Sequence, residues 1–443
     1  GLAYIASVLL RHGYDVEIYN QDMHHYPDFH LTEKLNKDKF DLIGVSVIGG
    51  YYQYRKLLKI SAAINAAKQR PFFVIGGHGP SPEPEFFLKK TKADAVVIGE
   101  GEATTLELLN AVINRKPLQH VRGIAFLESG KVVITGKRTL IRDIDTIPFP
   151  AYHLFPIGYY RLMRMPHVTN RDFALPILSG RGCTFTCAFC YRMDEGFRPR
   201  SNVSIIEEIK FLKANYGITY IAFADELLMS SAQRTVSLCE DFIKAGLNVR
   251  WDCNGRLNYA RPDVLKTMKR AGCVFINYGI EAMDDQVLKN MKKCLTVEQI
   301  IRGIEATLKE GISPGFNILF GNIGDNEETL KKGVEFLLKY DDGAQMRTIR
   351  PVTPYPGSPL YYYAIEKGFL KDCEDFYENK HINSDLLAVN FTNMSDDEFH
   401  RSLLEANTYL LENYFQKKMR ATIEQAENLY LKNDRSFRGF RVV

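Results

Sequence analysis

The feature that most restricts how this chain folds is the alternation of short apolar runs with longer amphipathic segments, which predicts strands and helices in turn. In the first part of the chain, the pattern predicts strands at 15–19, 42–48, 72–75 and 95–98 and helices at 1–12, 52–69, 83–90 and 103–114. Strands that alternate with helices form parallel sheets covered on both faces. Since the pattern opens on a helix, we expect that the chain begins inside its first domain and that a strand precedes Gly1.

The alternation resumes more regularly from 176 to about 353. It predicts strands at 177–179, 220–224, 249–253, 274–280, 315–320 and 346–352 and helices at 205–215, 232–245, 262–271, 285–293, 297–310 and 327–340. Six strand–helix units of this length fit a closed or partly closed parallel barrel. A hairpin is predicted at 123–128 and 132–135, a proline-rich linker follows it, and helices are predicted at 396–418 and 421–433. The predicted organisation is an α/β chain with a doubly wound domain at 1–140, a linker at 141–175, a partial (β/α)6 barrel at 176–360 and a helical segment at 361–443.

Length and charge exclude several classes of protein. The chain has 443 residues and a formal net charge of +4, which over this length does not indicate a nucleic acid partner. No run approaches the roughly 18 apolar residues of a membrane span, and the N-terminus lacks the residue order of a secretory signal. These features predict a cytoplasmic protein without a membrane span, whose eight cysteines are reduced thiols or metal ligands.

Three strands of the first domain each run into a turn of glycine and small residues. The turns are Ser46-Val47-Ile48-Gly49-Gly50, Gly76-Gly77-His78-Gly79-Pro80 and Gly99-Glu100-Gly101-Glu102. In open parallel sheets ligands bind outside the carboxyl ends of the strands, where glycine lets the backbone approach the ligand closely. Three such turns predict a large, flat or phosphate-bearing ligand. None of them has the GxGxxG or GxxxxGK[ST] spacing of a dinucleotide or nucleoside triphosphate site.

Three of the eight cysteines fall within eight residues, with the spacing Cys183-x3-Cys187-x2-Cys190. Structural zinc takes four ligands, usually as two close pairs, whereas the other cysteines of this chain are scattered singly. A disulfide does not fit a reducing compartment. Three thiolates on one loop fit an iron–sulfur cluster in which one iron lacks a cysteine and can take a chelating ligand.

This spacing, with Phe189 before the third cysteine and with the loop placed after the first barrel strand, resembles the radical S-adenosylmethionine superfamily. The resemblance implies a [4Fe–4S] cluster on Cys183, Cys187 and Cys190 whose remaining iron binds S-adenosylmethionine. One electron from the cluster then cleaves the sulfonium and gives a 5′-deoxyadenosyl radical. The resemblance also implies an electron donor such as a flavodoxin or a ferredoxin.

The same resemblance implies that S-adenosylmethionine meets the ends of the barrel strands. Asp225 and Glu226 would face the methionyl amine, although Ala224-Asp225-Glu226 replaces the usual Gly-Gly-Glu of the family. Arg256 would pair with the methionyl carboxylate through its guanidinium group, and Glu281 would accept hydrogen bonds from the ribose or the amine. The predicted S-adenosylmethionine contacts are Phe189, Asp225, Glu226, Asn254, Arg256, Glu281 and Phe320.

The first domain resembles the cobalamin-binding domain that precedes the barrel in one large subgroup of that superfamily. The three glycine turns match those of the subgroup in order, and their backbone amides would reach the corrin amides and the tail phosphate. We expect His78 to form part of the pocket wall rather than the axial ligand of cobalt. The predicted cobalamin contacts are Ser46, Val47, Gly49, Gly76, Gly77, His78, Gly99, Glu100, Gly101 and Glu102.

Together the two resemblances imply an enzyme that takes a hydrogen atom from an unactivated carbon of a small-molecule or peptide substrate and methylates that carbon from methylcobalamin. An alternative with the same cofactors is oxidative cyclisation or rearrangement without methyl transfer. A methylthiotransferase is disfavoured, because that group places further cysteines in its N-terminal domain and no cysteine precedes Cys183 here. A non-enzymatic sensor would bind the cofactors without forming 5′-deoxyadenosine. No residue is assigned as catalytic from the sequence.

Overall fold

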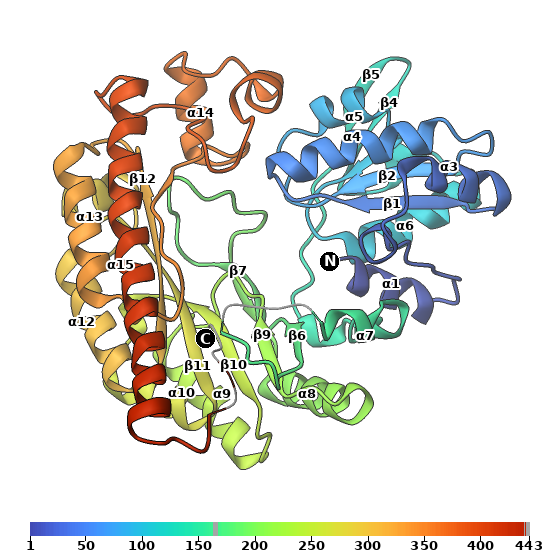
Figure 1. The fold of residues 1–443 in the computed structure, drawn as a ribbon. Coiled ribbons are helices and arrows are strands. Elements are labelled where there is room, and N and C mark those ends of the chain that lie inside the picture. Colours follow the sequence, from blue (N-terminus) through green and yellow to red (C-terminus); the bar gives the residue numbers. More distant parts are fainter. Residues whose placement is uncertain (163–166, 438, 440–443) are drawn as a thin grey trace. The chain divides into compact units, whose positions relative to one another are not determined.

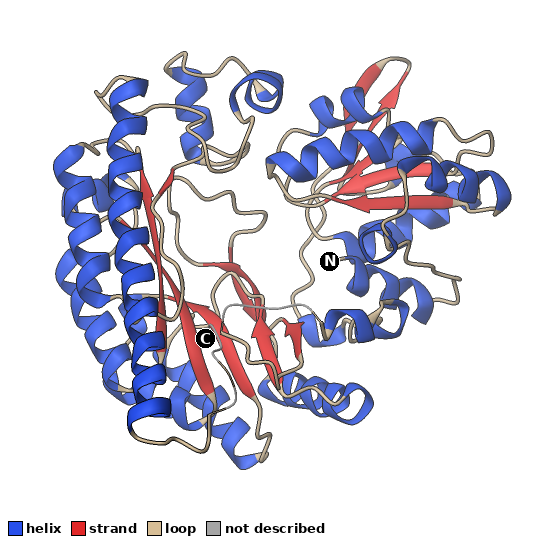
Figure 2. Ribbon diagram, viewed as in Figure 1, coloured by secondary structure: helices blue, strands red, loops and turns tan. Residues whose placement is uncertain are grey.

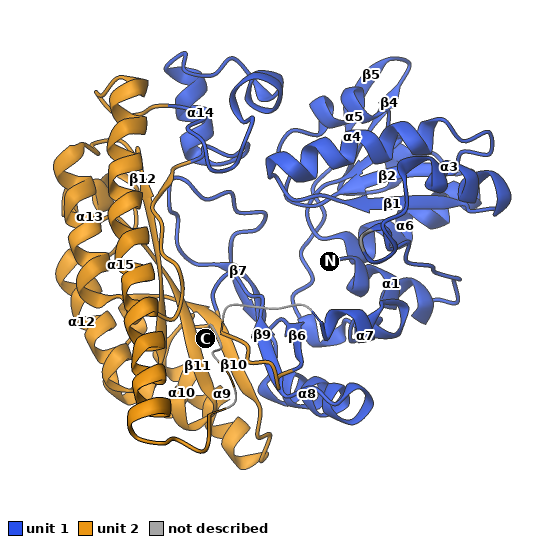
Figure 3. Ribbon diagram, in the orientation of Figure 1, with its two compact units in different colours: residues 1–163, 173–227, 353–389 blue, residues 164–172, 228–352, 390–443 orange. Residues whose placement is uncertain are grey.

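The computed structural model describes residues 1–162, 167–437 and 439. The chain divides into two compact units, which Figure 3 shows in different colours. Unit 1 contains residues 1–163, 173–227 and 353–389, and unit 2 contains residues 164–172, 228–352 and 390–443. The predicted linker residues 163–166 lie outside the described residues. Among the described helices, none is long and apolar enough to cross a membrane.

The N-terminal part of unit 1 is a five-stranded sheet with the order β1-β2-β3-β4-β5. Its first three strands, β1 (Leu42–Ser46), β2 (Phe72–Gly76) and β3 (Ala95–Val97), are parallel, and β4 (Ile124–Glu128) and β5 (Lys131–Ile134) add an antiparallel hairpin. The helices are α1 (Leu2–Arg11), α2 (Gln21–His24), α3 (Asp28–Lys37), α4 (Tyr51–Asn65), α5 (Pro84–Thr91) and α6 (Gly101–Ile113). Figure 1 shows α4 on one face of this sheet and α1 and α6 on the other, which is the predicted doubly wound arrangement.

The second part of unit 1 carries the segment predicted to begin the barrel. Strand β6 (Ala174–Ile177) pairs in parallel with β9 (Tyr220–Phe223), and α8 (Asn202–Tyr216) connects them. A short antiparallel pair, β7 (Gly180–Cys183) and β8 (Gly196–Pro199), stands between β6 and α8 in the chain. The linker contains the short helix α7 (Ile157–Tyr160), and the C-terminal part of the unit contains α14 (Pro359–Glu366) and a π-helical turn at Asp375–Lys380.

Unit 2 continues the alternation of strands and helices (Figure 2). Strands β10 (Arg250–Gly255), β11 (Cys273–Glu281), β12 (Ser313–Phe320) and β13 (Arg350–Pro351) pair in parallel. The helices are α9 (Ala232–Lys244), α10 (Pro262–Arg270), α11 (Asp285–Asn290), α12 (Val297–Lys309), α13 (Glu327–Tyr340) and α15 (Asp396–Leu431). Capping boxes begin three of these helices, at Thr296, Asn326 and Ser395. Of the six strands predicted for the partial barrel, unit 1 thus contains the parallel pair β6 and β9, and unit 2 contains the four parallel strands β10 to β13.

Three predicted elements differ from the structure. Residues 15–19, predicted as a strand, have no regular secondary structure, and residues 15–18 line the same cavity as β1. The strand predicted at 346–352 contains only Arg350 and Pro351. The two helices predicted after residue 396 form one continuous helix, α15, because no glycine or proline interrupts residues 418–421.

Candidate functional site

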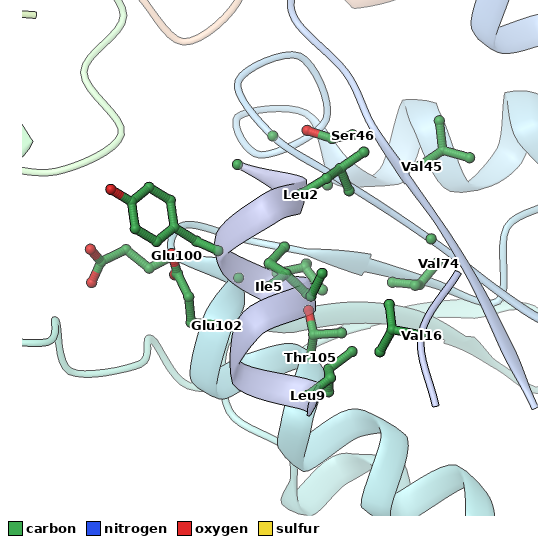
Figure 4. A pocket seen from close by; sticks show the side chains of 18 of the residues that line it. Leu2, Ile5, Leu9, Val16, Val45, Ser46, Val74, Glu100, Glu102 and Thr105 are labelled. Carbon is green, nitrogen blue, oxygen red and sulfur yellow. The ribbon is translucent and has the colours of Figure 1, made fainter. Parts of the chain in front are cut away.

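A cavity of about 1020 Å3 lies in unit 1, where its wall follows β1 and the residues before it from Lys39 to Ser46, includes α1 and residues 14–18, and reaches the carboxyl ends of β2 and β3. Figure 4 shows apolar side chains of α1 (Leu2, Ile5 and Leu9) on one side of this cavity. Ser46 and the residues of the second and third glycine turns also contribute to the wall. From the second part of unit 1, the lining includes Gly182, Asp194, Asp225 and Glu226. One cavity therefore joins residues predicted to bind cobalamin to residues predicted to bind S-adenosylmethionine.

Of the predicted cobalamin contacts, all except Val47 and Gly49 line this cavity. Val47 is buried and holds the first two turns together: its N–H donates to Gly76 O at 2.8 Å, and its O accepts from Gly79 N at 3.2 Å. A Cβ on Gly77, where φ is +104°, would lie 2.5 Å from Val47 O. Gly77 is therefore required for the close approach of these two turns.

The carboxylates of the third turn are engaged by two arginines. Glu100 accepts from Arg181 at 2.7 Å and from Arg198 at 2.9 and 3.0 Å, and Glu102 accepts from Arg181 at 2.6 Å. All four side chains are at most 14% exposed. Burial raises the pKa of Glu100, but hydrogen bonds from Arg198 and Arg181 outweigh that effect and leave the pKa below its usual value. Asp194 joins the group through Arg198 at 3.0 Å.

The three clustered cysteines lie at and after the end of β7. Cys187 is buried, Cys183 is half-buried and Cys190 is exposed, and Cys190 N donates to Cys187 O at 3.2 Å. Within the described residues, no group of three His, Cys, Asp or Glu side chains is arranged to hold a metal ion. The three thiols share one loop but do not form a preformed ligand set, so their role in binding a cluster stays a prediction based on their spacing.

Asp225 and Glu226 follow β9 and have different surroundings. Asp225 is buried, and its Oδ1 accepts from Ser179 N at 2.7 Å and from Gly180 N at 2.6 Å. This carboxylate therefore anchors the segment that leads from β6 into β7. Glu226 is 42% exposed, and its Oε1 lies 3.9 Å from Nε2 of His78. His78 lines the cavity, and its place in the wall of a cobalamin pocket stays a prediction.

The remaining predicted S-adenosylmethionine contacts lie in unit 2, apart from Phe189 in the cysteine loop. Glu281 is buried at the end of β11, and its Oε1 accepts from Lys293 Nζ at 2.7 Å. Arg256 is also buried and donates to the backbone O of Lys293. Phe320 is buried and stacks on Phe399 of α15, with the ring centroids 4.8 Å apart.

Next to the predicted contact Asn254, the structure adds two polar residues of unit 2 that sequence reasoning missed, Asn277 and Asn317. Asn277 Nδ2 donates to Asn254 Oδ1 at 3.1 Å, and Asn317 Nδ2 donates to Asn277 Oδ1 at 3.0 Å. This ladder crosses β10, β11 and β12, and Gly315 leaves room for it, since a Cβ there would lie 2.4 Å from Asn277 Oδ1. The signal in the sequence was an asparagine in each of three apolar strands, where alternation places it on the face that does not pack on helices.

The residues present fit a large organic cofactor at the cavity in unit 1. The cavity combines an apolar wall from α1 with the backbone of glycine turns, and a corrin ring has apolar faces and a rim of amides. Three thiols within eight residues fit an iron–sulfur cluster by the chemistry of the donor atoms, although they are not gathered here. The lining of the cavity therefore fits cobalamin. The three cysteines fit the cluster only by the type of their donor atoms.

Known proteins match both parts of the chain. Residues 177–337 match the radical SAM superfamily, and residues 1–109 match the B12 binding domain. The sequence is 30% identical over 375 residues to an uncharacterized methyltransferase of Pyrococcus horikoshii, a match that covers 84% of this chain and 79% of that protein. It is 28% identical over 386 residues to the anaerobic magnesium-protoporphyrin IX monomethyl ester cyclase of Rubrivivax gelatinosus, covering 85% of this chain and 68% of that protein. In fold it resembles the radical S-adenosylmethionine methyltransferase TsrM from Kitasatospora setae, solved with cobalamin and a [4Fe-4S] cluster bound, with a TM-score of 0.74 and 17% identity over 92% of this chain and 85% of that chain.

Proposed function

Because the chain belongs to the radical S-adenosylmethionine enzymes that carry a B12-binding domain, we propose that it methylates an unactivated carbon of a small-molecule or peptide substrate. Its cofactors are a [4Fe–4S] cluster, S-adenosylmethionine and cobalamin. The observation that carries the proposal is the cavity of about 1020 Å3 in unit 1, whose wall includes two of the glycine turns as well as Asp225 and Glu226. The name of the Pyrococcus relative, a methyltransferase, supports the same reaction.

When bound, the three cofactors supply a 5′-deoxyadenosyl radical that takes a hydrogen atom from the substrate and a methyl group that replaces it. Cys183, Cys187 and Cys190 would hold the cluster, and the turns at 46–50, 76–80 and 99–102 would hold cobalamin. The apolar side chains of α1 on the cavity wall would exclude water from the reacting groups. Asp225 would keep the segment before the cysteine loop in place through its bonds to Ser179 and Gly180.

The test is a turnover assay on protein reconstituted with iron, sulfide and hydroxocobalamin, with S-adenosylmethionine and a strong chemical reductant. We expect both 5′-deoxyadenosine and S-adenosylhomocysteine, together with the absorbance of bound methylcobalamin. A flavodoxin or a ferredoxin in place of the chemical reductant tests the proposed class of electron donor. Failure to form either nucleoside in protein with an intact cluster, with candidate substrates present, would contradict the proposal.

The cluster ligands can be tested separately from turnover, since the chain offers a matched control. Cys190 and Cys294 are both exposed, but only Cys190 belongs to the cluster motif. We expect C190A to lose the cluster absorbance and most of its iron after reconstitution, and C294A to retain both. Equal iron content in the two variants would show that Cys190 is not a ligand.

Cyclisation or rearrangement is the second candidate, because the Rubrivivax relative is named a cyclase and aligns over 85% of this chain. The same assay distinguishes the two reactions. Formation of 5′-deoxyadenosine without S-adenosylhomocysteine, in protein with bound cobalamin, would favour the second candidate over methyl transfer.

A further inference from the structure

The turn Gly99-Glu100-Gly101-Glu102 and the hairpin of β7 and β8 are joined by a buried group of charged side chains, which we call the Glu100 network: Glu100, Glu102, Arg181, Asp194 and Arg198. Glu100 bridges both arginines, at 2.7 Å to Arg181 and 2.9 Å to Arg198. Its second oxygen also accepts from the backbone N–H of Ile141 at 3.1 Å. Glu100 therefore binds three separate groups at once.

The hairpin requires such an acid because its two arginines face each other. Arg181 and Arg198 are direct partners in the β7–β8 pairing, and like charges placed opposite each other on neighbouring strands repel. Both side chains are only 14% exposed, so water screens this repulsion weakly. The carboxylate of Glu100 lies against both guanidinium groups and offsets their repulsion.

The same hairpin carries the first cysteine of the cluster motif. Cys183 is the last residue of β7 and pairs with Gly196, two positions from the Arg181–Arg198 pair on each strand. Only Gly182 separates Cys183 from Arg181 in β7. The arginines held by Glu100 thus determine the position of the strand end from which Cys183 extends.

We propose that Glu100 is a positioning residue, which docks the cysteine-bearing hairpin on the B12-binding domain and holds Cys183 in place for the cluster. This inference rests on the proposed role of Cys183 in the cluster. It assigns Glu100 and Glu102 to the support of the iron–sulfur site, whereas the turn motif alone predicts contacts to cobalamin. If Glu100 supports the iron–sulfur site, a Glu100 variant should lose iron. If Glu100 contacts cobalamin, the variant should lose cobalamin.

The experiment compares E100Q with the wild-type protein after reconstitution with the cluster and hydroxocobalamin. Loss of a group that orients a metal ligand weakens metal binding about 10- to 100-fold, so we expect a chelator to remove iron from E100Q at least about tenfold faster. The amount of bound cobalamin, read from its absorbance, should equal that of the wild type. The electron paramagnetic resonance spectrum of the reduced cluster should also broaden or shift, which a general loss of stability would not cause.

The matched control is E107Q. Glu107 lies on α6, the helix that follows Glu100, and pairs with Arg138, an arginine outside the hairpin. We expect E107Q to release iron at the wild-type rate. Circular dichroism establishes that each variant is folded, and E102Q, which removes the ion pair to Arg181, replaces E100Q if the latter does not fold.

A double-variant cycle tests whether the residues act as one network. R198M should accelerate iron release as E100Q does, and the double variant should be no faster than the more affected single variant. Additive effects, wild-type iron release from E100Q, or loss of cobalamin with an intact cluster would each overturn the proposal. If the wild-type protein assembles no cluster that depends on Cys183, the proposed function itself fails, and that outcome is visible before any Glu100 variant is compared.

Discussion

At the scale of single residues, His381 is a completely buried histidine in an aromatic box. Its ring stacks on Phe376 with the centroids 4.9 Å apart and meets Tyr355 and Tyr51 edge to face at 5.3 and 6.3 Å. Neither ring nitrogen has a hydrogen-bond partner among the described residues. Burial lowers the pKa of His381 to about 4, because the charged imidazolium cannot be hydrated there.

This histidine makes stability depend on pH. Between its folded pKa of about 4 and the ordinary histidine pKa of 6.5, the unfolded chain binds a proton that the folded chain does not. The free energy of unfolding is therefore highest above pH 6.5 and falls by at most about 3 kcal/mol as the pH drops towards 4. We expect H381F, which cannot be protonated, to lose less stability than the wild type between pH 7 and pH 4.5 in urea unfolding. Parallel pH profiles would contradict this.

Lys293 and Glu281 form a buried ion pair in which each side chain is only 7% exposed. Each charge therefore depends on the other for its stabilisation. K293M leaves the carboxylate of Glu281 buried without its cation, so we expect a loss of about 3–5 kcal/mol in the free energy of unfolding. Replacing both residues, as in K293M/E281L, removes the buried charge as well. Urea unfolding without S-adenosylmethionine should show that the double variant is more stable than K293M, and the reverse order would contradict this account.

The sequence predicts candidate site residues where a short motif with fixed spacing contains them. The spacing of Cys183, Cys187 and Cys190 marked the loop, and the third turn was recognised from Glu100 and its neighbours. The link between these motifs was not predictable, because Arg181 and Glu100 are 81 positions apart and only the folded chain brings them together. The same reason hid the asparagine ladder, whose members come from three strands.

At the scale of elements, two glycines with left-handed backbone allow a matched comparison of turns. Gly77 has φ +104° and a Cβ there would lie 2.5 Å from Val47 O, whereas Gly99 has φ +82° and no atom within 4 Å of such a Cβ. Alanine costs about 1–2 kcal/mol at either position through its backbone conformation, and G77A adds a steric clash. We therefore expect G77A to be less stable than G99A in urea unfolding and to retain less cobalamin. Equal losses would show that the turns can separate freely.

The alternation of strands and helices was predicted correctly because it depends on local patterning, as in β2 and β11. The hairpin of β7 and β8 was missed, since Gly180–Cys183 has two glycines and no apolar alternation. In this hairpin Arg181 pairs with Arg198, and an ion pair from Arg181 to Glu100, far away in the sequence, stabilises it. The segment 15–19 shows the converse, in that a strand-like pattern does not form a strand without a hydrogen-bonded neighbour.

At the scale of the whole molecule, the chain contains two compact units that need not unfold together. The single tryptophan of the sequence, Trp251, is 1% exposed and lies in unit 2. Its fluorescence therefore reports the unfolding of unit 2, whereas circular dichroism reports both units.

Cobalamin should affect these two signals differently. Its predicted cavity is lined entirely by residues of unit 1, and a ligand at 100 times its dissociation constant stabilises its site by about 2.7 kcal/mol. We expect hydroxocobalamin to raise the midpoint of one circular dichroism transition and to leave the Trp251 midpoint unchanged. A common shift of both signals would show that the two units unfold as one.

The Glu100 network also limits how this chain can be recombined with its relatives. A chimera joined within the proline-rich stretch would take the acidic turn from one parent and the two opposed arginines from the other. If the parents differ at either place, the new protein inherits buried charge without its counterpart. A crossover placed after Pro199 keeps Glu100, the two arginines and Cys183 together from one parent. A chimera designed to exchange substrate specificity should therefore use that boundary.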